Sequence, residues 1–362
     1  MTAILGIETS CDETAASVVL NGREVLSNIV SSQVAKHAPF GGVVPELAAR
    51  EHLNAISFVC EQALSLANFA IEDISAVAVT NGPGLIPSLL VGLNFAKGLA
   101  SARNIPLIGI NHFLAHIYGA FLDGKTDELN KPENFPVIAL VVSGGHTALV
   151  LFDQNGYAKV IGNTLDDASG EALDKAAKLL GLPYPGGPVI EKIALNGNSQ
   201  KIRFPRSLTG VAGKALEEEN RFNFSFSGVK TALYYYCEKN RKEGHLIEGE
   251  LLNDIVASYQ EAVLDVLCRK TVDATNFFRA KSVVACGGVA CNSKLRSKIK
   301  ESLDNNISFF TAPPKFCTDN AAMIAGLAYH MINYSVSNSA QIDAYSKIDS
   351  SKEMLIYCAK HN

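Results

Sequence analysis

The sequence lacks several features that would assign it to a common class of protein. No apolar run is long enough to span a membrane, and the N-terminus has neither the basic flank nor the cleavage pattern of a signal peptide. The eight cysteines include no CxxC pair, so neither a disulfide framework nor a zinc ribbon is indicated. The net charge of −4 argues against broad coating of nucleic acid by this chain alone. We therefore expect a cytoplasmic globular protein with reduced thiols and no membrane attachment.

The chain nearly repeats one pattern. Residues 4–22 read ILGIETSCDETAASVVLNG and residues 138–156 read IALVVSGGHTALVLFDQNG, so an apolar run, a small polar turn, a second apolar run and Asn-Gly recur. Turns of this kind leave backbone N–H groups free to face a ligand, and two facing copies would form a cleft. The alternative is chance similarity between two amphipathic hairpins. At 362 residues with 48% hydrophobic content, the chain is long enough for two such domains.

The elements that follow each hairpin also repeat. Asn-Gly predicts a third strand in each half, at about 24–30 and 158–163. The expected helices and strands of the first half are helix 44–66, strand 75–80, helix 87–103 and strand 106–110. Those of the second half are helix 170–180, helix 251–278, strand 282–286, helix 292–305 and strand 307–311.

This order predicts an α/β protein with duplicated actin-like domains, mixed sheets and an interdomain cleft, the ribonuclease-H-like fold shared by actin, sugar kinases and heat-shock ATPases (ASKHA). We expect an N-terminal domain over residues 1–135. A C-terminal helix at about 318–345 should pack at its junction with a second domain over 136–317, which carries an insertion at about 182–249.

Two histidines and one aspartate form a candidate metal site. His112 and His116 are spaced i, i+4, so on a helix both imidazoles lie on one face and can reach one ion. Asp319 follows the corresponding strand of the second half, so the two strand ends should meet between the domains. Two histidines and one carboxylate suit one divalent ion, Fe²⁺ or Zn²⁺. Two unrelated histidines on an amphipathic helix are the alternative.

Two glycine-bearing turns of the second half are candidates for nucleotide binding. Residues 286–292, CGGVACN, follow a β-branched strand and open a helix, so backbone can approach a ligand there, although Asn292 could instead be an ordinary helix cap. Residues 185–188, PGGP, form a rigid turn after the helix that carries Asp174. Together with residues 142–146, VSGGH, they suit a nucleotide whose phosphates lie at the hairpin turns.

Ten motifs in one order along nearly the whole chain carry a resemblance to a known family. They are ETSCDET, GGVVPELAAREH, NGPG, NHFLAH, SGGHT, GEALDKAAKLLG, YPGGP, FSFSGVKTA, CGGVACN and TDNAAMIA. Together they resemble the bacterial tRNA N6-adenosine threonylcarbamoyltransferases (TsaD), once described as glycoproteases. Zinc proteases of the HExxH type place a glutamate after the first histidine, and Phe113 stands there in this chain.

The resemblance implies transfer of a threonylcarbamoyl group from threonylcarbamoyl-AMP to N6 of the adenosine just 3′ of the anticodon, in tRNAs that read codons beginning with A. It also implies one divalent metal ion per subunit, with Fe²⁺ favoured over Zn²⁺. The implied partners are tRNA, a paralogous actin-like subunit (TsaB) and a small P-loop ATPase (TsaE). The implied metal ligands are His112, His116 and Asp319, and the implied substrate-binding residues are Val141, Val142, Ser143, Gly144, Gly145, Asp174, Gly187, Glu191 and Asn292.

Two positions depart from the family pattern. Relatives often carry two adjacent histidines where this chain has Asn111 before His112, which leaves the ligand pair intact but alters the hydrogen bonds around it. Residues 209–223 are longer and more charged than expected.

The sequence leaves the identity of the general base open. Asp12 and Glu13, on the first hairpin turn, are the acidic candidates, and either could instead organise the turn or metal-bound water. Two other classes of function compete. An ATP-dependent small-molecule kinase of the same fold would need a cleft aspartate but no HxxxH. A non-catalytic scaffold paralogue would have lost the metal ligands.

Overall fold

The protein is described from a computed structural model that covers residues 1–209, 218–332, 341–347 and 354–355. Contacts divide the chain into two units. Unit 1 comprises Met1–Phe135, Phe152–Lys159 and Phe310–Asn362, and unit 2 comprises Pro136–Leu151 and Val160–Phe309. Among the described residues, no helix is long and apolar enough to cross a membrane. Seven cysteines lie in the described ranges, and all are free thiols.

Unit 1 is built on a six-stranded mixed sheet, ordered β3-β2-β1-β5-β6 with β4 also paired to β2. The strands are β1 (Ala3–Glu8), β2 (Glu13–Leu20), β3 (Glu24–Val25), β4 (Ile29–Ser32), β5 (Ala76–Gly82) and β6 (Leu107–Asn111). β1 is antiparallel to β2 and parallel to β5, which is parallel to β6. The carboxyl ends of β1, β5 and β6 therefore meet at one edge, and Glu8, Thr80 and Asn111 lie there.

The expectation of one third strand over residues 24–30 is wrong, because the segment is interrupted. β3 pairs with β2 near Leu20, whereas β4 pairs with β2 near Glu13. Between them, Ser27 Oγ accepts from Val18 N at 3.0 Å, and Ser17 Oγ donates to the Ser27 carbonyl. These side-chain bonds replace ladder bonds and divide the strand.

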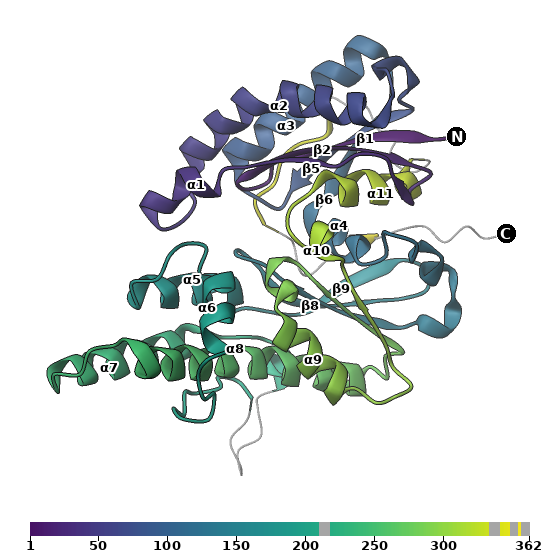
Figure 1. The fold of residues 1–362 in the computed structure, drawn as a ribbon. Coiled ribbons are helices and arrows are strands. Elements are labelled where there is room, and N and C mark those ends of the chain that lie inside the picture. The colour runs from purple at the N-terminus through teal and green to yellow at the C-terminus, as the bar shows by residue number, and fades with distance from the viewer. Residues whose placement is uncertain (210–217, 333–340, 348–353, 356–362) are drawn as a thin grey trace. The chain divides into compact units, whose positions relative to one another are not determined.

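Helices cover both faces of this sheet (Figure 1). α2 (Pro45–Ala67) packs on β2 and α3 (Ile86–Arg103) packs on β5, while α11 (Ala321–Met331) packs on β1, β2 and α4 (His112–Gly119). The core under α2 and α3 consists of small and branched side chains such as Leu5, Val18 and Val77. Unit 1 also contains the short helices α1 (Val34–His37) and α10 (Pro314–Cys317).

The last helix is shorter than expected. α11 begins at Ala321 because Asn320 caps it, with Asn320 Oδ1 accepting from Met323 N at 3.1 Å, and it ends at Met331. Asp319 therefore lies in the connection before the helix. The expected continuation of this helix to about 345 includes residues 333–340, which lie outside the described ranges.

The second sheet repeats the centre of the first. Its order is β11-β10-β7-β8-β9-β12, so the hairpin β7–β8 and the parallel neighbour β10 correspond to β1–β2 and β5. The strands are β7 (Val137–Val142), β8 (Thr147–Phe152), β9 (Tyr157–Asn163), β10 (Ser282–Cys286), β11 (Ser308–Thr311) and β12 (Met354–Leu355). Two mixed sheets with one shared pattern confirm the duplicated α/β fold.

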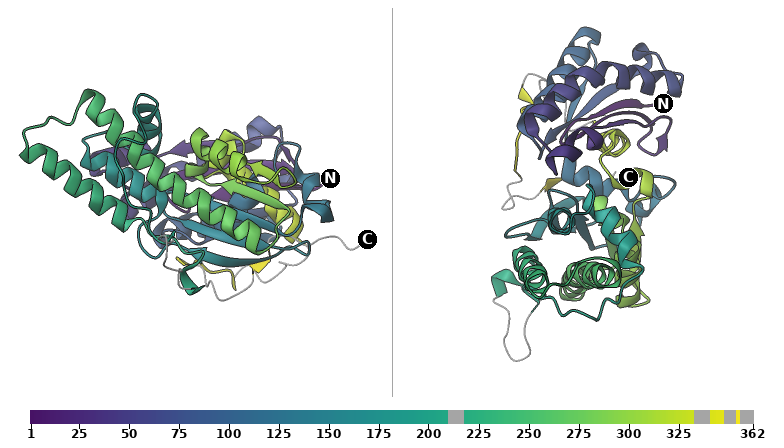
Figure 2. Two further views of the ribbon diagram at one scale, coloured as in Figure 1. Left: turned by 90° about the horizontal axis from the view of Figure 1, so that it is seen from below. Right: turned by 60° about the vertical axis from the view of Figure 1, so that its left-hand side comes forward.

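The α-helices in the described part of unit 2 are α5 (Ser169–Leu179), α6 (Gly186–Ala194), α7 (Ser227–Lys242), α8 (Gly249–Phe277) and α9 (Ser293–Ser302). α8 packs on β7, α6 and α9, and Figure 2 shows the long helices α7 and α8 running side by side. The expected insertion at 182–249 contains α6, α7 and a short 3₁₀ turn, Glu218–Asn220. Most of the unexpectedly long segment 209–223, residues 210–217, lies outside the described ranges.

Candidate metal centre

The first two candidate ligands lie on a helix that begins directly at the end of β6. Asn111 caps α4, with Asn111 Oδ1 accepting from Leu114 N at 3.0 Å. Its Nδ2 donates to Tyr345 Oη at 2.9 Å, so both polar atoms of the Asn111 amide are used in structural hydrogen bonds. His112 and His116 follow on one face of α4 and are 5% and 2% exposed. Their Nε2 atoms lie 3.1 Å apart.

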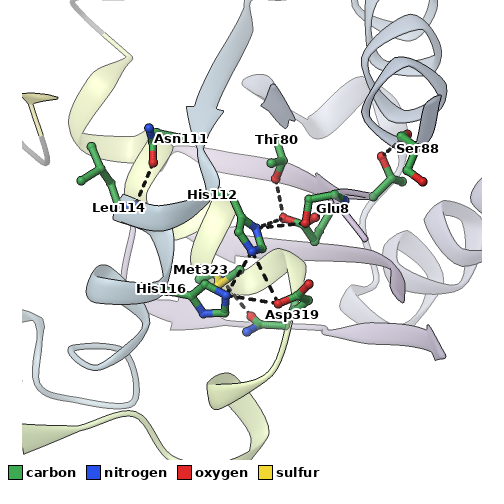
Figure 3. A network of polar contacts seen from close by, with 12 residues as sticks. Glu8, Thr80, Ser88, Asn111, His112, Leu114, His116, Asp319 and Met323 are labelled. Atoms are coloured by element: carbon green, nitrogen blue, oxygen red, sulfur yellow. Dashed lines mark hydrogen bonds and ion pairs between the residues drawn. The ribbon is translucent and has the colours of Figure 1, made fainter. Parts of the chain in front are cut away.

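Asp319 completes the group (Figure 3). Its Oδ1 lies 3.1 Å from His116 Nε2 and 3.6 Å from His112 Nε2, and one ligand atom from each residue lies within 4.8 Å of the others. The sequence pattern attributed Asp319 to the second half of the chain. In the structure it belongs to unit 1 with both histidines, because α11 packs on the first sheet. All three ligands therefore come from one unit.

A fourth residue, Glu8, was missed by the sequence reasoning. It is fully buried at the end of β1, and its Oε2 lies 2.9 Å from His112 Nδ1. Thr80 Oγ1 also donates to Oε2, and Ser10 N donates to Oε1. A carboxylate bound to Nδ1–H leaves Nε2 of His112 as the ligand atom, the usual arrangement around a protein-bound metal. The signal was a charged residue inside the apolar run ILGIE.

The electrostatics of the group suit a cation. Burial lowers the pKa of His112, but the carboxylates of Glu8 and Asp319 outweigh burial and raise the pKa to about 9. Burial likewise raises the pKa of Glu8, yet the charge of His112 brings it below its ordinary value. Two Nε2 atoms 3.1 Å apart beside a carboxylate need a proton or a metal ion between them. Two imidazoles and one carboxylate fit Fe²⁺ or Zn²⁺, and His112, His116 and Asp319 would hold it.

The acidic candidates lie on the turn between β1 and β2, in the same unit. Asp12 is 8% exposed, and Glu13 is the first residue of β2. Burial and the charges of Asp319 and Asp12 raise the pKa of Glu13 to about 10, so Glu13 holds a proton at neutral pH in the metal-free protein. Asp12 and Glu13 both stay candidates for the general base.

The residues of the second hairpin offer backbone rather than side chains to a ligand. Val141 and Val142 are buried in β7, whereas Gly144 and Gly145 are exposed and have no atom near the position of a Cβ. Ser143 closes the turn, with Ser143 N donating to the His146 carbonyl at 2.8 Å. This turn leaves the two glycines open to an approaching group.

The other candidate substrate residues meet around α6. Asp174 Oδ1 accepts from Gly186 N at 2.7 Å, which ties α5 to the start of α6, where Gly187 is open. At the other side, Glu191 Oε1 accepts from Ser293 N and Oγ at 2.8 and 2.7 Å, next to Asn292. α6 is therefore the common element of this group.

The amide of Asn292 is already engaged. Its Oδ1 accepts from Leu295 N at 3.0 Å as the cap of α9, and its Nδ2 donates to Gln260 Oε1 at 2.9 Å. Gln260 was missed by the sequence reasoning, because a buried glutamine in a long helix carries no local signal.

Comparison with known proteins decides the family. The family described as TsaD, tRNA N6-adenosine threonylcarbamoyltransferase, matches residues 24–326. The chain belongs to this family. A threonylcarbamoyltransferase of Geotalea uraniireducens is 47% identical over 342 residues, covering 94% of both chains. One of Caldicellulosiruptor saccharolyticus is 47% identical over 355 residues, covering 97% of this chain and 99% of the relative.

Solved structures support the fold. The chain resembles full-length HypF in its phosphate- and nucleotide-bound form with a TM-score of 0.55 at 15% identity, covering 93% of this chain and 47% of HypF. It also resembles component A of (R)-2-hydroxyglutaryl-CoA dehydratase from Acidaminococcus fermentans, with a TM-score of 0.50 at 16% identity, covering 91% and 98%. At this identity the likeness concerns the fold alone, which is the actin-like one.

Proposed function

We propose that this chain transfers the threonylcarbamoyl group of threonylcarbamoyl-AMP to N6 of the adenosine just 3′ of the anticodon in tRNAs that read codons beginning with A. The observation that carries the proposal is 47% identity over 94% of the chain to relatives named for this activity. The clustered metal ligands support it as well, since a scaffold paralogue would not need them and a small-molecule kinase would not use them.

The proposed reaction is an acyl transfer. N6 of the adenosine attacks the carbamoyl carbon of the donor, a C–N bond forms, the C–O bond to the phosphate breaks, and AMP leaves. One divalent ion, Fe²⁺ in preference to Zn²⁺, would supply Lewis-acid stabilisation of the charge that develops on the carbonyl oxygen. The amine must lose a proton, and Asp12 is the proposed acceptor.

We propose that the nucleotide part of the donor binds in unit 2. The backbone of Val141 to Gly145 would face the phosphate, since Gly144 and Gly145 have no side chains and are exposed. Asp174, Gly187, Glu191 and Asn292 would contact the adenosine. The bond between Asp174 and the start of α6 and the bond between Glu191 and Ser293, next to Asn292, support this proposal.

The proposed partners are tRNA, the paralogous subunit TsaB and the P-loop ATPase TsaE, as in the bacterial systems that the chain resembles. A net charge of −4 supports tRNA docking that uses the assembly rather than this chain alone. Because the substrate is tRNA, we place the activity in the cytoplasm.

A nucleoside analysis tests the proposal. The purified chain is loaded with Fe²⁺ or Zn²⁺ and supplied with its partners, tRNA and threonylcarbamoyl-AMP, and the tRNA is digested and analysed by mass spectrometry. We expect threonylcarbamoyladenosine with the wild type and none with His116→Ala, whose metal content should also fall. Unmodified adenosine with the metal-loaded wild type would refute the proposal.

The role of Asp12 is tested by Asp12→Asn. If the carboxylate accepts the proton of the amine, single-turnover transfer should fall by about 10²-fold or more, because Asn cannot serve as a base. Metal content and donor binding should stay at wild-type values. If Asp12 only shapes the turn, Asn can accept the same backbone hydrogen bonds and the rate stays near normal.

A further inference from the structure

A chain of buried hydrogen bonds leads to the turn that carries Asp12. His37, His52 and Gln33 are at most 3% exposed, and none of them belongs to the candidate ligands or substrate residues. Val44 N donates to His37 Nδ1 at 3.3 Å, and His37 Nε2 lies 3.1 Å from Gln33 Oε1. Gln33 Nε2 lies 3.4 Å from His52 Nδ1.

The series of hydrogen bonds ends on the turn between β1 and β2. His52 Nε2 lies 3.0 Å from the Cys11 carbonyl oxygen, and Thr14 Oγ1 lies 2.8 Å from His52 Nδ1. These contacts link the segment before α2, which contains Val44, to the peptide between Cys11 and Asp12.

The two ends of this series of hydrogen bonds determine which atom donates and which accepts at each step. The Val44 amide can only donate, so His37 Nδ1 carries no proton and His37 Nε2–H donates to Gln33. The Cys11 carbonyl can only accept, so His52 donates from Nε2–H and its Nδ1 accepts. Gln33 satisfies both, with its oxygen toward His37 and its amide toward His52. Each ring thus donates from Nε2 and accepts at Nδ1, and burial, which lowers the pKa of His52, agrees with a neutral imidazole at that position.

Two successive carbonyl groups of the turn accept hydrogen bonds from the side of Gln33 and His52. The Cys11 oxygen accepts from His52, and the Asp12 oxygen accepts from Gln33 N at 3.0 Å. On the other side of the turn, Ser10 N donates to Glu8, and Ser10 Oγ lies 3.3 Å from His112 Nδ1. The turn is thus clamped between the residues around the metal ligands and the buried histidines. Any rotation of the Cys11–Asp12 peptide would break the bond to His52.

We propose that His52 is a positioning residue for the transfer reaction, whose Nε2–H on the Cys11 carbonyl sets the orientation of Asp12. The inference rests on the proposed function, since transfer is its readout. It does not make His52 a catalytic residue, because His52 is fully buried behind the turn. Small displacements of a reacting group by remote residues lower rates strongly, by up to about 10²-fold for roughly 1 Å.

A matched pair of substitutions tests the role of the Nε2–H group. In His52→Gln the side-chain amide can occupy the place of Nε2–H and donate to Cys11. In His52→Asn the amide lies near the place of Nδ1, so it can meet Thr14 or Gln33 but falls short of Cys11. We expect His52→Asn to lower single-turnover transfer by about 10-fold or more and His52→Gln to recover most of the rate. Metal content and donor affinity should match the wild type in both variants.

The outcomes separate this inference from the proposed function. A wild type that makes no threonylcarbamoyladenosine overturns the proposed function. An active wild type with equal rates in the two variants overturns the inference, as does loss of metal in His52→Asn, which would indicate general disruption. If His52→Asn does not fold, Thr14→Val serves instead, because it removes the hydroxyl at His52 Nδ1 with little change of volume. A several-fold slower transfer is then expected, and a wild-type rate contradicts the inference.

Discussion

At the scale of single residues, Glu8 shows how a buried charge is accommodated beside the metal ligands. A fully buried carboxylate such as that of Glu8 would strongly destabilise the fold if it had no partner. Glu8 instead accepts from Ser10 N and Thr80 Oγ1 and pairs with His112 Nδ1. The pairing orients one imidazole and makes its Nε2 the ligand atom. Glu8 therefore acts on the metal site through His112.

Glu8→Gln should weaken metal binding without removing a ligand. The amide cannot accept from all three donors at once, so His112 loses its orienting carboxylate, and losses of this kind lower metal affinity by about 10–100-fold. The measurement is competition with a chelator of known affinity. Thr80→Ser, which keeps the hydroxyl donor to Glu8, is the matched control and should bind like the wild type. Equal affinities in all three proteins would show that Glu8 has no orienting role.

His52 should make the stability of the fold sensitive to acid. Burial lowers its pKa below the ordinary value of 6.5, against the opposing effects of the Cys11 carbonyl, Glu8 and Asp12, while His37 lowers it further. Because the unfolded chain binds this proton more readily, the stabilising contribution is present above pH 6.5 and is lost as the pH falls.

The matching experiment compares thermal midpoints at about pH 7 and about pH 5. His52→Gln has no group to titrate, so its acid-induced decrease should be smaller than that of the wild type by roughly 2–4 °C. His245→Gln changes an exposed histidine and should behave like the wild type. An unchanged pH dependence in His52→Gln would mean that His52 does not contribute.

At the scale of elements, α6 joins the parts of unit 2 that we assign to the donor. At its start, Gly186 N donates to Asp174 of α5. Further along, Glu191 accepts a hydrogen bond from Ser293 at the start of α9. Its first two glycines differ in their surroundings. A Cβ at Gly186 would meet Ala177 Cβ at 2.6 Å and Asp174 Cα at 2.8 Å, whereas one at Gly187 would have only Leu173 Cδ1 at 4.0 Å. Gly186 is required by packing, and Gly187 is not.

Gly187→Val should therefore separate ligand binding from folding. A branched side chain would stand where we propose that the nucleotide approaches backbone, so affinity for threonylcarbamoyl-AMP should fall by at least about 10-fold, the effect of roughly 1.4 kcal/mol. The thermal midpoint should stay close to that of the wild type. Gly186→Ala is the contrasting variant, which should lower the midpoint because its methyl group has no room. Calorimetric titration with unchanged affinity in Gly187→Val would remove Gly187 from the donor site.

At the scale of the whole molecule, the metal ligands all belong to unit 1. His112 and His116 come from α4, and Asp319 comes from the connection before α11, which packs on α4 and on β1. A metal ion would tie two segments that are 203 residues apart in the sequence. It should therefore stabilise unit 1 by a cross-link between these two segments.

Metal loading should protect unit 1 selectively from hydrogen exchange. A ligand present at about 100 times its dissociation constant stabilises the state that binds it by about 2.7 kcal/mol. We expect slower exchange over α4, β1 and α11 after metal is added and no matching change in α8, measured by mass spectrometry of peptides. His116→Ala is the control that should abolish the difference. Equal protection of α8 and α4 would contradict a site confined to unit 1.

Features that depend on local spacing could be predicted from the amino-acid sequence alone. The alternation of strands and helices predicted β5, α3, β6 and α8 to within two residues at each end, because periodicity reports which face of an element is buried. The pairing of His112 with His116 was equally local, since two residues spaced four apart in a helix lie on the same face.

The residues that these local features contact could be identified only from the folded structure. Glu8 and His112 are 104 residues apart, and the register of three parallel strands brings them together. The same is true of His52, which reaches Cys11 across 41 residues because α2 packs on β2. Asp319 joined unit 1 rather than unit 2 through the packing of α11. No local pattern records such contacts, because each depends on how distant apolar faces are buried against one another.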